Sequence, residues 1–145
     1  VVIILDFFKK KNLFLTKYKL CSHNGKKFYN EDPFLFFQKC QEAGAGEIVI
    51  NSVDNDGLMK GYDLDLVLEL KPFVKTPITF LGGAGSLDHI EELIENFGTV
   101  GAAAGSLFVF KGKYRAVLIN YPTLAEKIEI CSKAMKVYNH SSEKI

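Results

Sequence analysis

Residues 47–74, EIVINSVDNDGLMKGYDLDLVLELKPFV, hold the pattern that decides the fold. They open with a short run, 47–53, in which polar and aliphatic side chains alternate, as in a strand with two different faces. A turn-rich segment follows, and then 62–74 repeats leucines at the spacing of an amphipathic helix. A strand, a loop and a helix in this order form the repeating unit of an α/β protein.

The same unit recurs on both sides of this stretch. Strands are expected at 1–8, 76–83 and 99–110, and helices at 32–44, 86–98 and 123–139. Asp32 and Ser86 are N-cap candidates for two of the helices, and Gly44 and Gly98 follow as stop signals. Strands that alternate with helices predict a parallel sheet with right-handed crossovers.

The pattern leaves two closures open, a doubly wound sheet or a barrel. Glu47, Val49 and Asn51 share one face of their strand, opposite an aliphatic face, and this parity favours a barrel with a polar lumen. A closed barrel of this kind needs eight units, but the pattern predicts four here. We therefore expect 1–145 to be one half-barrel domain, with a hairpin inserted near 12–29 where Asn-Gly occurs.

A half-barrel would leave two long strand edges unpaired, which favours pairing with another chain. The chain also begins with Val1 inside an apparently buried strand. Both features are expected of a piece of a longer protein, and we expect the isolated half to self-associate and to be inactive alone.

The composition argues against several kinds of partner. Lys plus Arg (18) nearly balance Asp plus Glu (17), which leaves no basic excess for nucleic acid or a membrane surface. No apolar run reaches the length that spans a bilayer. The three cysteines, at 21, 40 and 131, are odd in number and lack zinc-site spacing. We expect reduced thiols in a cytoplasmic protein, with no metal.

Acidic and small residues collect where the expected strands end. They are Asp6, Asp54, Asp56, Gly82, Gly83, Gly85, Gly105 and Ser106. In parallel α/β folds the carboxyl ends of the strands carry the active site. This shared edge is therefore the candidate site. The histidines (23, 89 and 140) match no catalytic or metal spacing and are expected at the surface.

Each group at this edge has a structural and a functional interpretation. Asp6 suits general acid/base catalysis if it faces a partly dry lumen, but a strand-end aspartate also commonly bonds a loop. "DNDG" (54–57) is turn chemistry or the rim of an anion site. "GGAGS" (82–86) before a helix is a phosphate cradle of weak specificity, which "AAAGSLF" (102–108) strengthens.

Three segments together resemble a known family. They are "GAGEIVINSVDNDGLMKGYDLDLV", "TPITFLGGAGSLDH" and "AAAGSLFVF", in this order. The stretch from Val1 to about Phe110 resembles the C-terminal half of the cyclase subunit (HisF) of imidazole glycerol phosphate synthase. The resemblance implies half of a (β/α)₈ barrel of the ribulose-phosphate-binding type. It also implies ammonia-dependent lyase/cyclase chemistry on a phosphoribulosyl carboxamide ribonucleotide, without a cofactor.

The resemblance also implies roles for individual residues. Asp6 matches the catalytic aspartate of the fifth barrel strand, and Asn51 matches a polar lumen position. Glu47 matches a charged residue at the barrel bottom, where ammonia from a glutaminase partner enters. The residues that match one phosphate site are Asp56, Gly57, Gly82, Gly83, Gly105 and Ser106.

The chain departs from the cyclase pattern at Leu58, Leu81 and Val109, where that family usually has Thr, Ser and His. With "GSLFVFKGKYRAVLINYP", these departures resemble a paralogue that works with a glutaminase in amidating sugars of surface polysaccharides. The resemblance thus leaves two substrates open, a phosphorylated ribonucleotide or a sugar. A phosphate-binding half-barrel without catalysis is the third possibility.

Overall fold

The computed structural model of the chain describes residues 1–11, 16–111, 114 and 116–142. Its strands are β1 (Val2–Lys11), β2 (Thr16–Ser22), β3 (Lys27–Phe28), β4 (Glu47–Ser52), β5 (Ile78–Leu81), β6 (Gly101–Ala102), β7 (Phe110–Lys111) and β8 (Ala116–Val117). Its helices are α1 (Pro33–Glu42), α2 (Leu64–Leu70), the 3₁₀ turn η1 (Lys71–Phe73), α3 (Leu87–Phe97), α4 (Ser106–Val109) and α5 (Leu124–Ser142).

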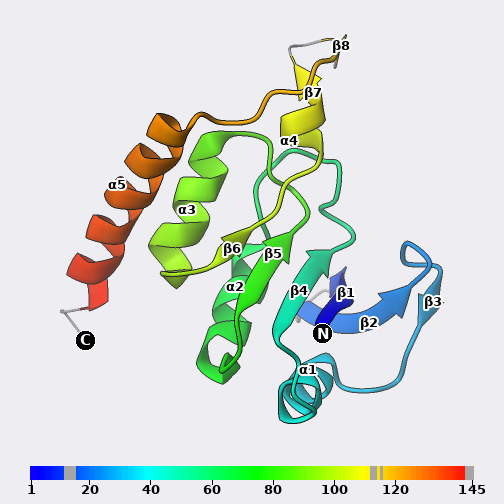
Figure 1. The fold of residues 1–145 in the computed structure, drawn as a ribbon. Helices are drawn as coiled ribbons and strands as arrows, with labels where there is room; N and C mark the ends of the chain where they lie inside the picture. Colours follow the sequence, from blue (N-terminus) through cyan, green and yellow to red (C-terminus); the bar gives the residue numbers. More distant parts are fainter. Residues whose placement is uncertain (12–15, 112–113, 115, 143–145) are drawn as a thin grey trace.

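The main sheet has the strand order β3-β2-β1-β4-β5-β6 (Figure 1). Its β1–β4, β4–β5 and β5–β6 pairs are parallel, as the alternating pattern predicts. The register places Asp6 beside Asn51, and Asn51 beside Leu81. The side chains of these three neighbours therefore lie on the same face of the sheet.

The opposite face of the sheet packs against the helices. The buried residues of this core include Phe7, Ile48, Ile50, Ile78 and Phe80 from the strands, with Phe37, Leu66, Leu70 and Leu93 from α1, α2 and α3. In β4 the buried and half-buried residues alternate strictly, which confirms the predicted parity. On the other face of β1, Val2 and Ile4 are 58% and 63% exposed, so this face lacks a covering layer.

The hairpin prediction is confirmed in part, and the two open edges are shorter than predicted. Strand β1 continues to Lys11 and pairs antiparallel with β2 from Asp6 onward, so β2 pairs with the last six of the ten residues of β1. Asn24 and Gly25 adopt positive φ in the turn before β3. Residues 12–15 lie outside the described part of the chain. At the other edge, β6 is only two residues long.

The helix boundaries follow local chemistry. Asp32 caps α1, accepting hydrogen bonds from the backbone N–H groups of Phe34 and Leu35 at 3.0 and 2.9 Å. The helix expected at 62–74 is shorter: α2 ends at Leu70, and Pro72, which has no N–H, lies in the 3₁₀ turn that follows. Helix α5 packs on α3 and extends past the expected end at 139 to Ser142.

The strand expected at 99–110 is the clearest error. Only Gly101–Ala102 pairs with β5, and residues from Ser106 form the single turn α4. Val109 N–H donates to Gly105 O at 3.1 Å, so the backbone bonds are local rather than between strands. A run of alanine and glycine has little intrinsic preference for a strand, and the apolar pattern concealed this.

Candidate functional site

Asp6 and Asn51 form the polar centre of the uncovered face. Asn51 Nδ2 donates a hydrogen bond of 2.9 Å to Asp6 Oδ1. Asn51 Oδ1 is buried and has no hydrogen-bond partner among the described residues. A buried acceptor without a donor is costly, and it is commonly satisfied by water or a ligand. The structure therefore places a carboxylate and an unsatisfied acceptor side by side, near the carboxyl end of β4 and near the end of the part of β1 that pairs with it.

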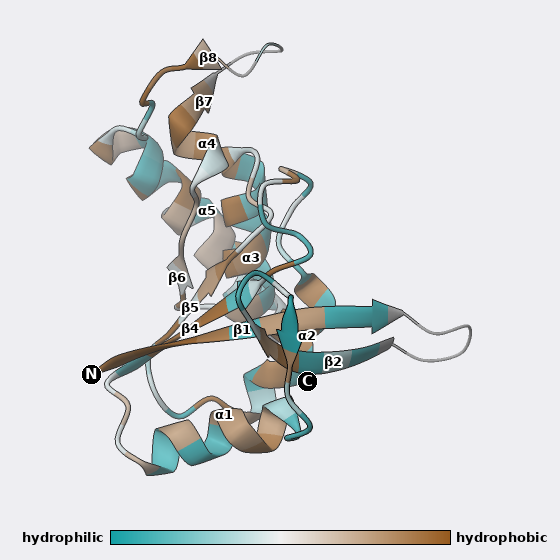
Figure 2. Ribbon diagram, turned by 90° about the vertical axis from the view of Figure 1, so that its right-hand side faces the viewer, coloured by the Kyte–Doolittle hydropathy of each residue, from teal (hydrophilic) through white to brown (hydrophobic). Residues whose placement is uncertain are grey.

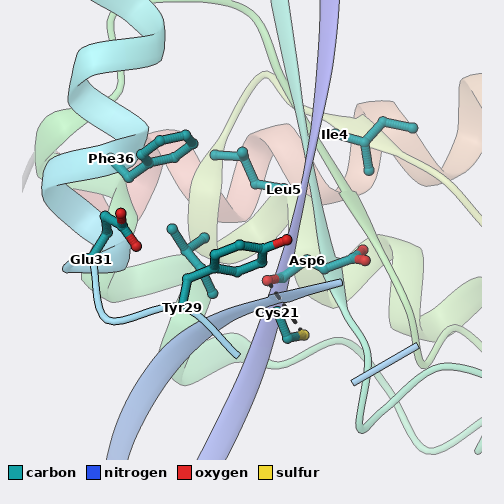
Figure 3. Close-up of a pocket in the computed structure, with 8 residues that line it drawn as sticks. Ile4, Leu5, Asp6, Cys21, Tyr29, Glu31 and Phe36 are labelled. Atoms are coloured by element: carbon teal, nitrogen blue, oxygen red, sulfur yellow. Dashed lines mark hydrogen bonds between the residues drawn. The ribbon is translucent and has the colours of Figure 1, made fainter. Parts of the chain in front are cut away.

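A pocket of ≈ 290 Å³ adjoins Asp6 along the edge of β1. Figure 3 shows Tyr29, Glu31 and Phe36 on one side of β1, with the Asp6 carboxylate and Ile4 directed to the other side. Cys21 Sγ donates to the backbone oxygen of Asp6 at 3.7 Å, and burial raises the pKa of this thiol. The residues expected to bind phosphate are not among those that line this pocket.

The loop after β4 begins as a tight turn. The N–H groups of Asn55 and Asp56 donate to Ser52 O at 3.1 and 3.0 Å. Gly57 has φ of 74°, a left-handed conformation that glycine adopts without strain. Asp56 is exposed at the tip of the turn. The turn interpretation of "DNDG" is thus confirmed, and it leaves Asp56 accessible.

The glycine segment after β5 packs against this loop, backbone to backbone. A Cβ on Gly83 would lie 2.0 Å from Gly61 O, and one on Gly85 would lie 2.3 Å from Met59 O. A Cβ on Gly82 would lie 2.6 Å from Ser52 O. Gly61 N–H donates to Gly83 O at 2.8 Å. These glycines are therefore required for the contact between the two loops, whether or not they also bind a ligand.

Helix α3 begins directly after these glycines. Ser86 is its N-cap residue, but its side chain makes no capping hydrogen bond. His89 Nδ1 instead accepts the Gly85 N–H at 3.0 Å. His89 is half-buried, while His23 and His140 are exposed as expected.

The third rim segment follows β6. Gly105 is the N-cap residue of α4 and is exposed, and Ser106 beside it is half-buried. Tyr62 OH donates to Ala103 O at 2.9 Å and so ties this segment to the loop before α2. Burial raises the pKa of Tyr62 to about 12, so its hydroxyl remains a donor at neutral pH. Hydrogen bonds thus connect the loops after β4, β5 and β6.

Glu47 lies at the opposite end of the sheet, at the start of β4. Thr79 Oγ1 donates to Glu47 Oε1 at 2.6 Å. Gly101 makes room for this threonine, because a Cβ at 101 would lie 1.9 Å from Thr79 Oγ1. Glu47 therefore lies on the same face of the sheet as Asn51, but away from the rim.

Sequence reasoning missed a polar cluster behind the rim. It consists of Lys9, Tyr18, Asp63 and Asp65, which meet across 45 to 56 residues of sequence. No local pattern predicts such a pairing; the one available signal was the Asp-x-Asp at the start of α2.

Other classes of site find no support. In the part of the chain that the structure describes, no group of three or more His, Cys, Asp or Glu side chains could hold a metal ion. Within the same residues, no helix combines the length and the apolar composition needed to cross a bilayer. The three cysteines are free thiols, with Cys21 and Cys40 buried and Cys131 exposed.

The parallel strands, the helices on one face and the polar groups at the strand ends define a partial (β/α)₈ barrel with its candidate site at the carboxyl rim. A family model described as "Histidine biosynthesis protein" matches residues 1–115. The chain belongs to this histidine biosynthesis family.

Individual relatives agree with this assignment. A protein of Vibrio vulnificus strain YJ016, provisionally named imidazole glycerol phosphate synthase subunit hisF3, is 54% identical over 127 residues, which cover 88% of this chain and 48% of the relative. A provisionally named HisF subunit of Leptospira borgpetersenii is 47% identical over 127 residues, 88% of this chain and 49% of the relative. The imidazole glycerol phosphate synthase subunit HisF of Petrotoga mobilis is 36% identical over 116 residues, 80% and 44% of the two chains. The chain thus spans about half the length of the relatives it matches.

Proposed function

We propose that these residues form the C-terminal half of an ammonia-dependent lyase/cyclase of the imidazole glycerol phosphate synthase type. The enzyme would use ammonia from a glutaminase subunit to cleave and cyclise a phosphoribulosyl carboxamide ribonucleotide in the cytoplasm. It would need no cofactor. Membership of the family and relatives with this subunit name support the proposal.

The observation that carries the proposal is the Asp6–Asn51 pair. In an ammonia-using reaction, a carboxylate held in a fixed orientation can take and return protons. The Asn51 Oδ1 acceptor, buried and unsatisfied, suits a ligand with N–H donors, and ammonia is such a ligand. Asp6 would be the general acid/base, and Asn51 would orient both Asp6 and the nucleophile.

The rim loops would hold a substrate phosphate. The backbone N–H groups of Gly57, Gly83 and Gly105 and the start of α3 are donors of the kind that bind phosphate. Gly82 allows the close approach of the loops, and Ser106 offers a hydroxyl. Asp56, exposed beside Gly57, would border the bound anion.

The Glu47–Thr79 pair would mark the entrance for ammonia. A carboxylate fixed by a hydroxyl at the bottom of the lumen face can attract an ammonium ion and accept its hydrogen bonds. Glu47 and Asn51 lie near opposite ends of β4 on the same face. Ammonia that enters beside Glu47 would therefore move along this face from the bottom of the barrel to the rim.

One observation favours a second function, ammonia delivery for sugar amidation. Leu58 is 50% exposed and Val109 is 39% exposed, where the cyclase pattern has Thr and His. Two apolar side chains at these rim positions would remove hydrogen bonds to a ribonucleotide. A substrate with fewer polar groups there would be accommodated.

The test is turnover by the intact protein that carries these residues, with its glutaminase partner. The wild type is assayed with the phosphoribulosyl carboxamide ribonucleotide and ammonium, beside Asp6→Asn and the control Glu129→Gln, an exposed carboxylate on α5. We expect the turnover of Asp6→Asn to fall at least about a hundredfold, and the control to match the wild type.

Absence of wild-type turnover, with phosphate still bound at the rim, would favour the sugar-amidation paralogue. That alternative is then tested with ammonia transfer to a sugar acceptor. If neither substrate reacts, the non-catalytic phosphate-binding module is the remaining function.

A further inference from the structure

Lys9 lies on the part of β1 that continues past the parallel sheet. Figure 2 shows β1 changing from apolar near the N-terminus to hydrophilic in this distal part, where it pairs with β2. Lys9 is opposite Tyr18 in the strand pair, and its Nζ is 5.7 Å from the centre of the Tyr18 ring. The Lys9 side chain is only 12% exposed, which is unusual for a lysine.

Two groups of Lys9 contact the two ends of one loop. Its backbone N–H donates to Asp54 Oδ1 at 3.1 Å, at the start of the loop between β4 and α2. Its Nζ donates to Asp63 Oδ1 at 2.8 Å, at the end of the same loop. A further bond of 2.8 Å reaches Asp65 Oδ2, which is 73% exposed. Lys9 therefore contacts both the first and the last residue of the loop 54–63.

Asp63 is held from three directions. Its side chain is 3% exposed and caps α2 by accepting the Leu66 N–H at 3.3 Å. The Tyr18 hydroxyl lies 3.1 Å from both carboxylate oxygens. Burial by itself would lower the pKa of Lys9, but the hydrogen bonds with Asp63 and Asp65 and the charge of Asp63 raise it overall. Lys9 thus remains charged over the working pH range.

The loop that Lys9 brackets contains residues of the proposed phosphate site. Asp56 and Gly57 lie inside it, and Gly61 packs on Gly83 of the second rim loop. A buried ion pair contributes little to stability compared with a well-packed apolar replacement, so stability alone gives a weak reason for this one. A fixed geometry for the loop gives a stronger reason.

We propose that Lys9 is a positioning residue, which holds both ends of the loop 54–63 so that the loop presents its backbone to a bound phosphate. Tyr18 on β2 holds Asp63 in place through its hydroxyl, so the β1–β2 hairpin contributes indirectly to ligand binding. This inference rests on the proposed phosphate site, although Lys9 itself does not contact the ligand.

The experiment compares Lys9→Met with Lys10→Met in the intact protein. Lys10 is the next residue of the same strand and its side chain is exposed, so the control makes the same chemical change outside the cluster. Lys9→Arg tests rescue by a conserved charge, and Asp65→Asn removes the charge of the exposed partner of Lys9. Two quantities are measured: the dissociation constant for inorganic phosphate, and hydrogen exchange of the amides in 54–63.

For Lys9→Met we expect the dissociation constant for phosphate to rise at least about tenfold over the wild type. We expect the exchange rates of the amides in 54–63 to rise by a similar factor. Lys10→Met and Asp65→Asn should stay within about twofold of the wild type, and Lys9→Arg should recover part of the affinity. If Lys9→Met does not fold, Tyr18→Phe replaces it, because that variant loses one hydroxyl and keeps the ion pair. We then expect a smaller loss, about threefold.

Two results would overturn the inference alone: wild-type phosphate binding that Lys9→Met or its substitute leaves unchanged, or loop exchange that the change does not accelerate. A wild type that binds no phosphate at the rim would overturn the proposed phosphate site first, and the positioning role with it.

Discussion

Asn51 Nδ2 lies 2.9 Å from Asp6 Oδ1, and this bond determines which amide atom faces the carboxylate. If the amide were turned over, two acceptors would meet, unless Asp6 carried a proton. The orientation of Asn51 is therefore coupled to the protonation of Asp6.

Asn51→Leu tests this coupling in the intact protein. Leucine has a similar volume but can neither donate to Asp6 nor accept from a ligand. We expect kcat to fall about ten- to a hundredfold, with a melting temperature near that of the wild type, because an unsatisfied buried acceptor is lost together with a hydrogen bond. Asn51→Thr keeps a donor and should retain most activity. Full activity of Asn51→Leu would show that the pair is not catalytic.

Gly83→Ala should separate packing from catalysis. The new Cβ would lie 2.0 Å from Gly61 O at a residue with φ of 102°, so both a backbone clash and an unfavourable conformation result. We expect the free energy of unfolding to fall by about 3 kcal/mol or more, measured by denaturant titration.

Gly105→Ala is the matched control for that experiment. A Cβ on Gly105 would meet no atom within 4 Å, and its φ is −100°. Its stability should stay within about 0.5 kcal/mol of the wild type. Equal losses for both glycines would mean that the loop contact is not what requires Gly83.

The raised pKa of Tyr62 predicts that the folded protein loses stability at alkaline pH. This pKa is raised by burial to about 12 in the folded protein, against an ordinary value of 10.0 for an exposed tyrosine. Between these two pH values the unfolded chain releases the phenolic proton and the folded chain keeps it, so stability is complete below pH 10 and declines as the pH rises towards 12. The difference in unfolding free energy between the wild type and Tyr62→Phe should shrink over this interval. A constant difference would contradict the assignment.

The isolated residues 1–145 should form dimers or larger species. The first four residues of β1, Val2–Leu5, are not paired with β2, and the lumen-facing Val2 and Ile4 are largely exposed. An open edge beside an uncovered apolar face favours pairing with a second copy. Light scattering measures this directly, and a stable folded monomer at micromolar concentration would refute it. Ile4→Lys should shift the distribution toward the monomer.

The parity of β4 was predictable from sequence because steric alternation alone determines it. Glu47 and Asn51 had to lie on the face opposite Ile48 and Ile50 once the segment formed a strand. The N-cap of α1 was equally predictable, since Asp32 and Pro33 act on their own backbone.

Longer-range features were not predictable in this way. Lys9 and Asp63 are 54 residues apart, and the Asp-x-Asp at the start of α2 does not indicate which distant residue contacts it. The glycines after β5 suggested a phosphate cradle, but the contact of Gly83 with Gly61 depends on a loop more than twenty residues earlier. The strand expected at 99–110 failed for the opposite reason: small residues carry too little local preference to decide their own conformation.

The packing of Gly83 on Gly61 has a consequence for transplanting this rim into another barrel. Where side chains separate two loops, a designer can adjust one loop by changing its residues. Here the backbones touch, and no substitution can restore the fit if only one loop is moved. The segments 54–63 and 82–86 must therefore be transferred together as one unit, and Lys9 must be transferred with them.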